Sequence, residues 1–238
     1  MQHARPASRL ALLALPILAL GAIVAEAAPA RAQEPVESGA IVHKGGYIAF
    51  GFGYAAASGD RGVPLKTKAG VTLSIPSNLY DETVRTDFGS GMSFELRFGW
   101  LIGPIAPEIA IFGHGGFDFE NGAGYPVFQL RFHPLLLVDS LAGSAFDANV
   151  YAGVGYAIGG YHHEGDDDGK GWDGLAITFG FGGSYALSSR VHLALDVKFA
   201  MPQYSKWIYD YDDDIEFEPA STPSTLIVAP SLQLQCFF

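Results

Sequence analysis

Apolar and polar side chains alternate along the end of the chain, LIVAPSLQLQCFF, most strictly from Leu232 onward. A period of two is typical of a β-strand with one face in an apolar medium and the other in a polar one. The apolar face of this strand is predicted to carry Leu232, Leu234, Cys236 and Phe238. The opposite face is predicted to carry Ser231, Gln233, Gln235 and Phe237.

The same period recurs in seven earlier segments. Their predicted ranges are 46–57, 90–101, 105–112, 125–133, 149–160, 173–187 and 190–201. In the first, large side chains such as Phe50 and Phe52 alternate with Gly51 and Gly53, and a soluble barrel would keep the large ones in its core. We therefore expect the large residues to face lipid and the small ones to face the interior. The prediction is an all-β fold, an eight-stranded antiparallel up-and-down transmembrane β-barrel over residues 46–238.

The connections between these strands alternate in length. Long segments at 58–89, 114–124, 161–172 and 202–223 are rich in Gly, Asp or Tyr and are expected on the external side. The segments 102–104 and 188–189 are short turns. The connection 134–146 is apolar without alternation, and we interpret it as a periplasmic connection with a helical turn.

The N-terminus has the layout of a secretory signal peptide. Arg5 and Arg9 precede an apolar stretch over 10–25, and Ala30-Arg31-Ala32 stands before Gln33 as an A-x-A cleavage site. An uncleaved membrane anchor is the alternative, but this apolar run is shorter than the ~20 residues of a spanning helix. We expect residues 1–32 to be removed and residues 33–45 to form a periplasmic lead-in.

An exported chain with eight such strands, ending on an aromatic residue, resembles the OmpA/OmpX-type eight-stranded outer-membrane β-barrel family of Gram-negative bacteria. The resemblance covers about residues 46–238. It implies an outer-membrane location, with membrane lipid and lipopolysaccharide as partners. It also implies that the strand ending at Phe238 closes the barrel and is recognised by the outer-membrane insertion machinery.

Charge and cysteine content narrow the possible functions. Removal of residues 1–32 takes away three arginines and one glutamate, so the net charge of −11 becomes −13. Nucleic acid is therefore not an expected partner, because its phosphates require a basic surface. The single cysteine, Cys236, allows neither an intrachain disulfide nor a cysteine-based metal site. No cofactor is implied.

Several charged side chains fall on the inward face of the predicted strands. They are Glu95, Arg97, Glu108, Arg131, Asp196 and Lys198, with His133 and His192 toward the periplasmic half. An eight-stranded barrel is only just wide enough for side chains to fill it. Charges enclosed there must be paired, because an isolated buried ion costs several kcal/mol. The prediction is a polar plug in a structural barrel without catalysis, and a proton or ion path is the alternative.

The external loops carry the other candidate chemistry. Segments 162–164 and 166–168 and residues Asp210 and 212–214 supply imidazoles and carboxylates, but no Ser/His/acid set stands at a strand end. We therefore do not expect an enzyme, although a lipid-modifying activity stays an alternative, as does weak divalent-cation binding by the acidic loops.

Aromatic residues suggest contacts with the membrane surface and with a partner. We predict an interfacial girdle formed by Tyr54, Trp100, Tyr125, Tyr161, Trp172, Tyr185, Tyr204 and Trp207. Tyr209 and Tyr211, together with Trp207, are candidates for an external contact surface. This keeps an adhesin or surface-recognition role as the principal alternative. A soluble lipocalin-like binder is disfavoured, because glycine-lined inner faces could not pack a soluble core.

Overall fold

The computed structural model describes residues 45–60, 63, 65–66, 72–73, 86, 88–116, 121–138, 141, 144–161, 170–210 and 215–238. The predicted signal peptide, with Ala30, Ala32 and Gln33, and the lead-in up to residue 44 lie outside the described residues. Within the described ranges, no helix has the length and apolar character needed to cross a membrane.

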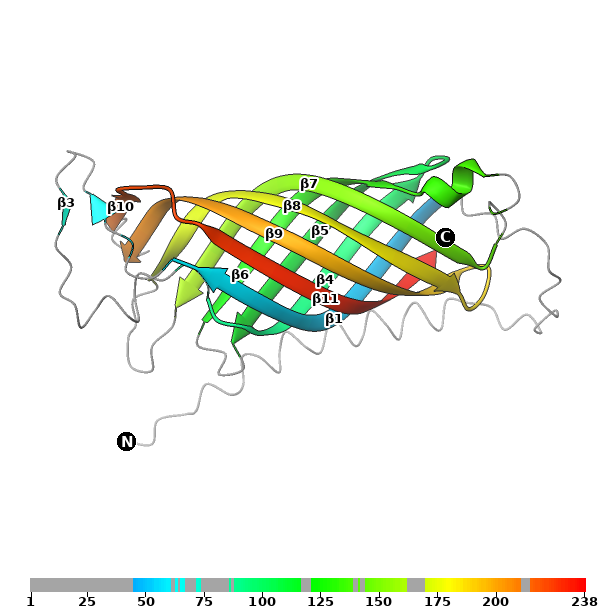
Figure 1. The fold of residues 1–238 in the computed structure, drawn as a ribbon, viewed down its shortest axis with the longest axis horizontal. Helices are drawn as coiled ribbons and strands as arrows, with labels where there is room; N and C mark the ends of the chain where they lie inside the picture. The colour runs from blue at the N-terminus through cyan, green and yellow to red at the C-terminus, as the bar shows by residue number, and fades with distance from the viewer. Residues whose placement is uncertain are drawn as a thin grey trace, which may run out of the picture. The chain divides into compact units, whose positions relative to one another are not determined.

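Eight strands form a closed antiparallel barrel in up-and-down order (Figure 1). They are β1 (Gly45–Gly59), β4 (Gly91–Leu101), β5 (Ile105–Gly116), β6 (Asn121–Phe132), β7 (Phe146–Tyr161), β8 (Lys170–Ala186), β9 (Val191–Asp210) and β11 (Thr225–Phe237). The strand β11 pairs with both β9 and β1, which closes the barrel as predicted.

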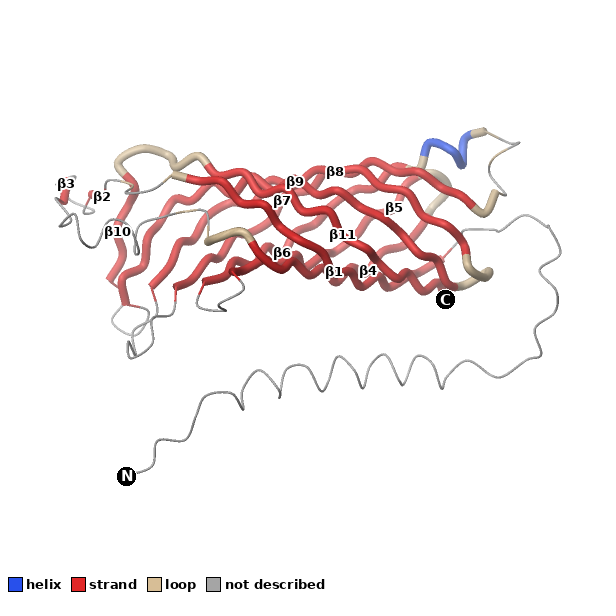
Figure 2. The backbone as a smooth tube through the Cα atoms, turned by 60° about the horizontal axis from the view of Figure 1, so that its bottom comes forward, coloured by secondary structure: helices blue, strands red, loops and turns tan. Residues whose placement is uncertain are grey.

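The register fixes the stagger of the barrel. Cross-strand partners lead from Tyr47 through each strand in turn and return to β1 at Ala57, ten positions further along. A stagger of this kind inclines the strands to the barrel axis, as Figure 2 shows, and leaves an interior that side chains can fill.

The predicted orientation of large and small residues is confirmed. On the outer face Phe52, Ile109 and Leu195 are 55%, 62% and 67% exposed. Inward neighbours such as Ala110 and Ala194 are buried. In the terminal strand Leu232, Leu234 and Phe238 are exposed, Cys236 is partly buried, and Gln233 and Gln235 are buried. A continuous outer surface of this kind is stable only in hydrocarbon.

Several strands are longer than the sequence pattern predicts. The predicted loop 114–124 is mostly strand, because β5 continues to Gly116 and β6 begins at Asn121. The predicted loop 202–223 contains the end of β9 and a further strand, β10 (Ile215–Pro219), which pairs with β9. Glycine, proline and aspartate indicate loops in a sequence, yet here the ladder of cross-strand pairs continues through them. The short strands β2 (Leu65–Lys66) and β3 (Thr72–Leu73) continue from β10.

The predicted aromatic girdle is wrong for four of its members. Tyr54, Trp100 and Tyr185 are exposed on the outer face, and the side chain of Tyr161 lies outside the described residues. The four others lie in the barrel interior and are Tyr125, Trp172, Tyr204 and Trp207. They occupy inward positions of strands that extend further than predicted, so the same alternation that turns aliphatic residues outward turns these aromatic residues inward.

These residues belong to an apolar cluster that fills the half of the interior opposite Gly45 and Phe238. Phe88 from the first long connection is fully buried within it, with its ring 5.9 Å from that of Tyr204. The backbone of Phe88 has a φ of 46°, a left-handed conformation that is uncommon outside glycine. At Gly159 a side chain would collide with the Phe88 ring. The glycine therefore provides the space in which Phe88 is seated.

The opposite end of the barrel carries Gly45 and Phe238, and we call it the periplasmic end after the predicted orientation. The predicted helical turn is a 3₁₀ helix, η1 (Pro134–Leu137). Leu136 from η1 packs against a small interior cluster that includes Tyr47 and Leu101.

Candidate functional site: an ionic network across the barrel interior

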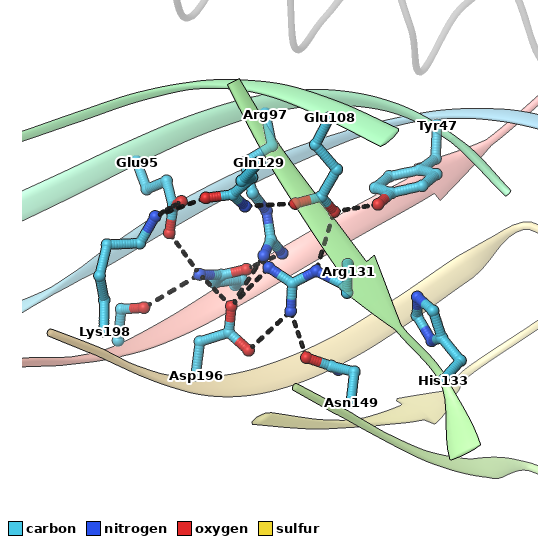
Figure 3. A network of polar contacts seen from close by, with 12 residues as sticks. Tyr47, Glu95, Arg97, Glu108, Gln129, Arg131, His133, Asn149, Asp196 and Lys198 are labelled. Carbon is cyan, nitrogen blue, oxygen red and sulfur yellow. Dashed lines mark hydrogen bonds and ion pairs between the residues drawn. The ribbon is translucent and has the colours of Figure 1, made fainter. Parts of the chain in front are cut away.

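A continuous network of polar side chains crosses the middle of the barrel (Figure 3). Three acids and three bases form its charged part, and all six side chains are buried. They come from β4, β5, β6 and β9 and are Glu95, Arg97, Glu108, Arg131, Asp196 and Lys198. Equal numbers of opposite charges in one buried layer allow each ion to be paired, which a low-dielectric interior requires.

Arg131 joins the two sides of the network. Its Nε donates to Glu108 Oε1 at 2.8 Å. Its two Nη atoms donate to the Asp196 carboxylate at 3.3 and 3.2 Å, and Nη1 also donates to Asn149 Oδ1. The Tyr151 ring lies against the guanidinium, 4.1 Å from Cζ to the ring centroid. The planar guanidinium thus contacts groups from β5, β7 and β9 at once.

Arg97 and Glu108 extend the network toward β11 and β1. Arg97 Nη1 donates to Asp196 Oδ2 at 2.7 Å, so that Asp196 is shared between two arginines, and Arg97 Nη2 donates to Gln233 Oε1. Glu108 accepts hydrogen bonds from the Tyr47 hydroxyl and from Gln129 Nε2 in addition to Arg131. The two carboxylates are therefore satisfied by charged and neutral donors together.

Lys198 and Glu95 form the ion pair nearest to the aromatic half of the interior. Lys198 Nζ lies 2.5 Å from Glu95 Oε1 and 3.2 Å from Gln129 Oε1. It also lies 5.1 Å from the Tyr151 ring centroid and 5.5 Å from that of Phe112, within the range of a cation–π interaction. Gln233 Nε2 links the pair to the arginines by donating to Glu95 Oε2 at 3.0 Å and Asp196 Oδ2 at 3.2 Å.

Glycines of β8 make room for this network. A Cβ at Gly182 would overlap the Asp196 carboxylate, and a Cβ at Gly180 would overlap the Tyr151 ring. β8 supplies no charged side chain to the network, and its small residues leave space that side chains of the neighbouring strands fill.

The two predicted histidines lie at the periplasmic end, beside the charged layer. His133 Nδ1 lies 2.6 Å from Asp147 Oδ2, and both residues are buried. His192 is buried with its ring 4.7 Å from that of Phe237.

The sequence and the fold were compared with those of known proteins. No protein-family model and no curated protein matches the chain. Among solved structures, Neisserial surface protein A (NspA) has 12% sequence identity and a TM-score of 0.53, with 82% of this chain and 98% of NspA covered. OprG, an outer membrane protein from Pseudomonas aeruginosa, has 14% identity and a TM-score of 0.52, with 84% and 99% covered.

The chain has the eight-stranded outer-membrane β-barrel fold. At these identities the similarity concerns the fold alone. The apolar outer surface requires a surrounding membrane. Together with the fold, this surface places the protein in the outer membrane.

Some network residues of this outer-membrane barrel were not among the predicted candidates. They are Tyr47, Gln129, Asn149 and Gln233. Asp147, the partner of His133 beside the network, was not a predicted candidate either. Asp147 lies before the predicted start of its strand, since β7 begins at Phe146 rather than at 149. A repeat was available as a signal for the glutamines, because PVFQL at 126–130 and PSLQL at 230–234 place Gln129 and Gln233 at equivalent positions, each opposite a glycine.

Most of the candidate residues in the external loops lie outside the described part of the chain. Residues 162–169 and 211–214 lie outside the described residues, as do the side chains of Tyr209 and Asp210. In the part of the barrel that is described, no three His, Cys, Asp or Glu side chains gather as ligands for a metal ion.

Proposed function

We propose that this outer-membrane barrel is an envelope structural protein with a plugged interior. The observation that supports the proposal is the ionic network, whose six charged side chains are buried and reach one another across the barrel. Each ion has a partner of opposite charge, so none of these side chains is left to hydrate a permeating ion. The aromatic cluster fills the interior beyond the network.

A conductance measurement tests this proposal. Purified protein is refolded into phospholipid vesicles, the folded fraction is measured by heat-modifiable gel migration, and the vesicles are fused with a planar bilayer. We expect no stepwise conductance from preparations that are fully folded. A reproducible unitary conductance from folded wild-type protein would refute the plug and favour the alternative of a small channel.

A surface-interaction role is the second candidate. It is favoured by the external extension, defined as the end of β9 together with β10 and β2, which continues the sheet beyond the barrel wall at the end opposite Phe238 (Figure 1). An extended ribbon of this kind adds backbone and side chains for contact that a barrel embedded in lipid does not need.

Trimming the extension separates the two roles. A variant in which residues 209–216 are replaced by a short Gly-Asn turn should still fold, because the barrel pairs β8 with β9 and β9 with β11 stay intact. If the extension acts in recognition, bacteria that express the variant should lose attachment and autoaggregation relative to wild type at equal surface levels. Unchanged attachment would refute the recognition role and would support the structural role only.

A further inference from the structure

The connection between β6 and β7 carries an apolar surface outside the barrel interior. Leu137, Val138 and Leu141 are 62%, 44% and 41% exposed. The segment 134–146, PLLLVDSLAGSAF, contains a single charged residue, Asp139, and no lysine or arginine. Exposed apolar side chains gathered on one short segment mark a contact with lipid or with another protein.

The backbone of this connection is largely satisfied by its own turns. Leu136 N donates to His133 O at 3.2 Å and Val138 N donates to Leu135 O at 3.2 Å. The next turns repeat the pattern, with Leu141 N donating to Val138 O at 2.8 Å and Ser144 N donating to Leu141 O at 2.9 Å. Internal hydrogen bonding lowers the cost of placing backbone near hydrocarbon, where water is scarce.

The exposed residues continue the lipid-facing surface of the barrel. The strands on either side end and begin with outward residues Phe132 and Phe146, which are 37% and 54% exposed. The rim of the periplasmic end carries further exposed apolar residues, which are Ile102, Ile105, Tyr185, Leu187 and Phe238. The outer surface is thus apolar up to the last outward positions of the wall, at the depth where η1 begins.

The position of η1 agrees with this continuity. In both views of the barrel, η1 lies at the margin of the periplasmic end (Figures 1 and 2). Leu136 points inward and packs with the small interior cluster, which anchors the segment to the wall. Leu137 and Val138 follow it in the chain; both are exposed and neither belongs to that cluster.

From these observations we propose that the segment around η1 is a membrane anchor that lies in the periplasmic leaflet of the outer membrane. Leu137, Val138 and Leu141 insert at the boundary between phospholipid headgroups and acyl chains. Segments with an apolar face of this kind bind in the plane of the interface rather than across the bilayer. The partner is phospholipid, and a water-exposed periplasmic loop is the arrangement that this proposal replaces.

Spin-label accessibility tests the proposal in vesicles of phosphatidylethanolamine and phosphatidylglycerol. A nitroxide is attached at Leu137→Cys in a Cys236→Ala background, and its collision rates with oxygen and with a nickel chelate are compared. Leu195→Cys on the outer wall is the lipid control. Ser189→Cys, an exposed residue in the β8–β9 turn at the same end of the barrel, is the matched aqueous control.

We expect the oxygen-to-nickel ratio at residue 137 to be several times that at residue 189 and close to that at residue 195. Val138→Cys serves as a second reporter if the first variant folds poorly. A ratio at 137 and 138 equal to that at 189 would overturn the proposal, as would low collision rates with both reagents, because the segment would then pack against protein. Neither result would bear on the plugged interior.

Discussion

The Lys198–Glu95 ion pair offers a direct measure of what the buried network contributes. Replacing Lys198 with Met keeps much of the side-chain volume but leaves the Glu95 carboxylate with Gln233 as its remaining hydrogen-bond partner. Replacing Glu95 with Gln leaves the ammonium of Lys198 with Gln129 and two aromatic rings. Each single change therefore isolates one charge in a fully enclosed site.

The expected magnitudes follow from the burial of both groups. Breaking a buried pair by removing one partner costs about 3–5 kcal/mol, because an uncompensated charge stays behind. The double variant, Glu95→Gln with Lys198→Met, removes both charges, and its main loss is the donor to Gln129 Oε1, about 1 kcal/mol. The double variant should therefore be more stable than either single variant, with a coupling energy of about 3 kcal/mol or more.

Urea unfolding from phospholipid vesicles, followed by tryptophan fluorescence and by heat-modifiable gel migration, measures the four free energies of the cycle. Reversibility is checked by refolding from high urea. Additive effects, in which the double variant loses the sum of the two single losses, would refute the reasoning. Single variants as stable as wild type would refute it as well, because they would mean that water reaches the two charges.

Three further outcomes are expected. Arg97→Ala should lower the free energy of unfolding in the same urea assay by about 3 kcal/mol, since Asp196 loses its 2.7 Å partner; an unchanged midpoint would contradict the pairing. Gly182→Val should destabilise the barrel by about 1–3 kcal/mol through overlap with Asp196, whereas the control Gly124→Ala, whose added Cβ meets no atom within 4 Å, should stay within about 0.5 kcal/mol. The backbone N of Phe238 donates to Gly46 O at 2.9 Å. Deleting Phe238 should slow assembly by the outer-membrane insertion machinery in cells more than it slows refolding into detergent. Equal slowing of both processes would mean that Phe238 acts in strand closure alone.

Local alternation of residue types was enough to predict the fold and which face of each strand points outward. In a strand the side-chain direction reverses at every residue, so a run such as Met92 to Trp100 predicts its two faces without knowledge of its neighbours. The same rule turned Glu95 and Arg97 inward, and closure followed because unpaired strand edges cannot exist in hydrocarbon.

The ends of the strands were not predictable in this way. Residues such as His114 and Tyr204 stand among glycines, prolines and acids that are typical of loops, and they became strand only because a neighbouring strand supplies backbone partners. Their aromatic and imidazole rings therefore fill the interior instead of lining the membrane surface. The composition of a segment indicates its own preference for a loop, but it does not indicate whether a neighbouring strand is present to pair with it.

The pairing within the network depended on tertiary structure for a related reason. Alternation determined that Arg131, Glu108 and Asp196 face inward, but each lies on a different strand, and their separations depend on the stagger of ten residues around the barrel. That stagger brings Arg131 of β6 to Asp196 of β9 across the interior. Sequence by itself determined which side chains enter the barrel, and only the closed sheet, through its register, decided which of them meet.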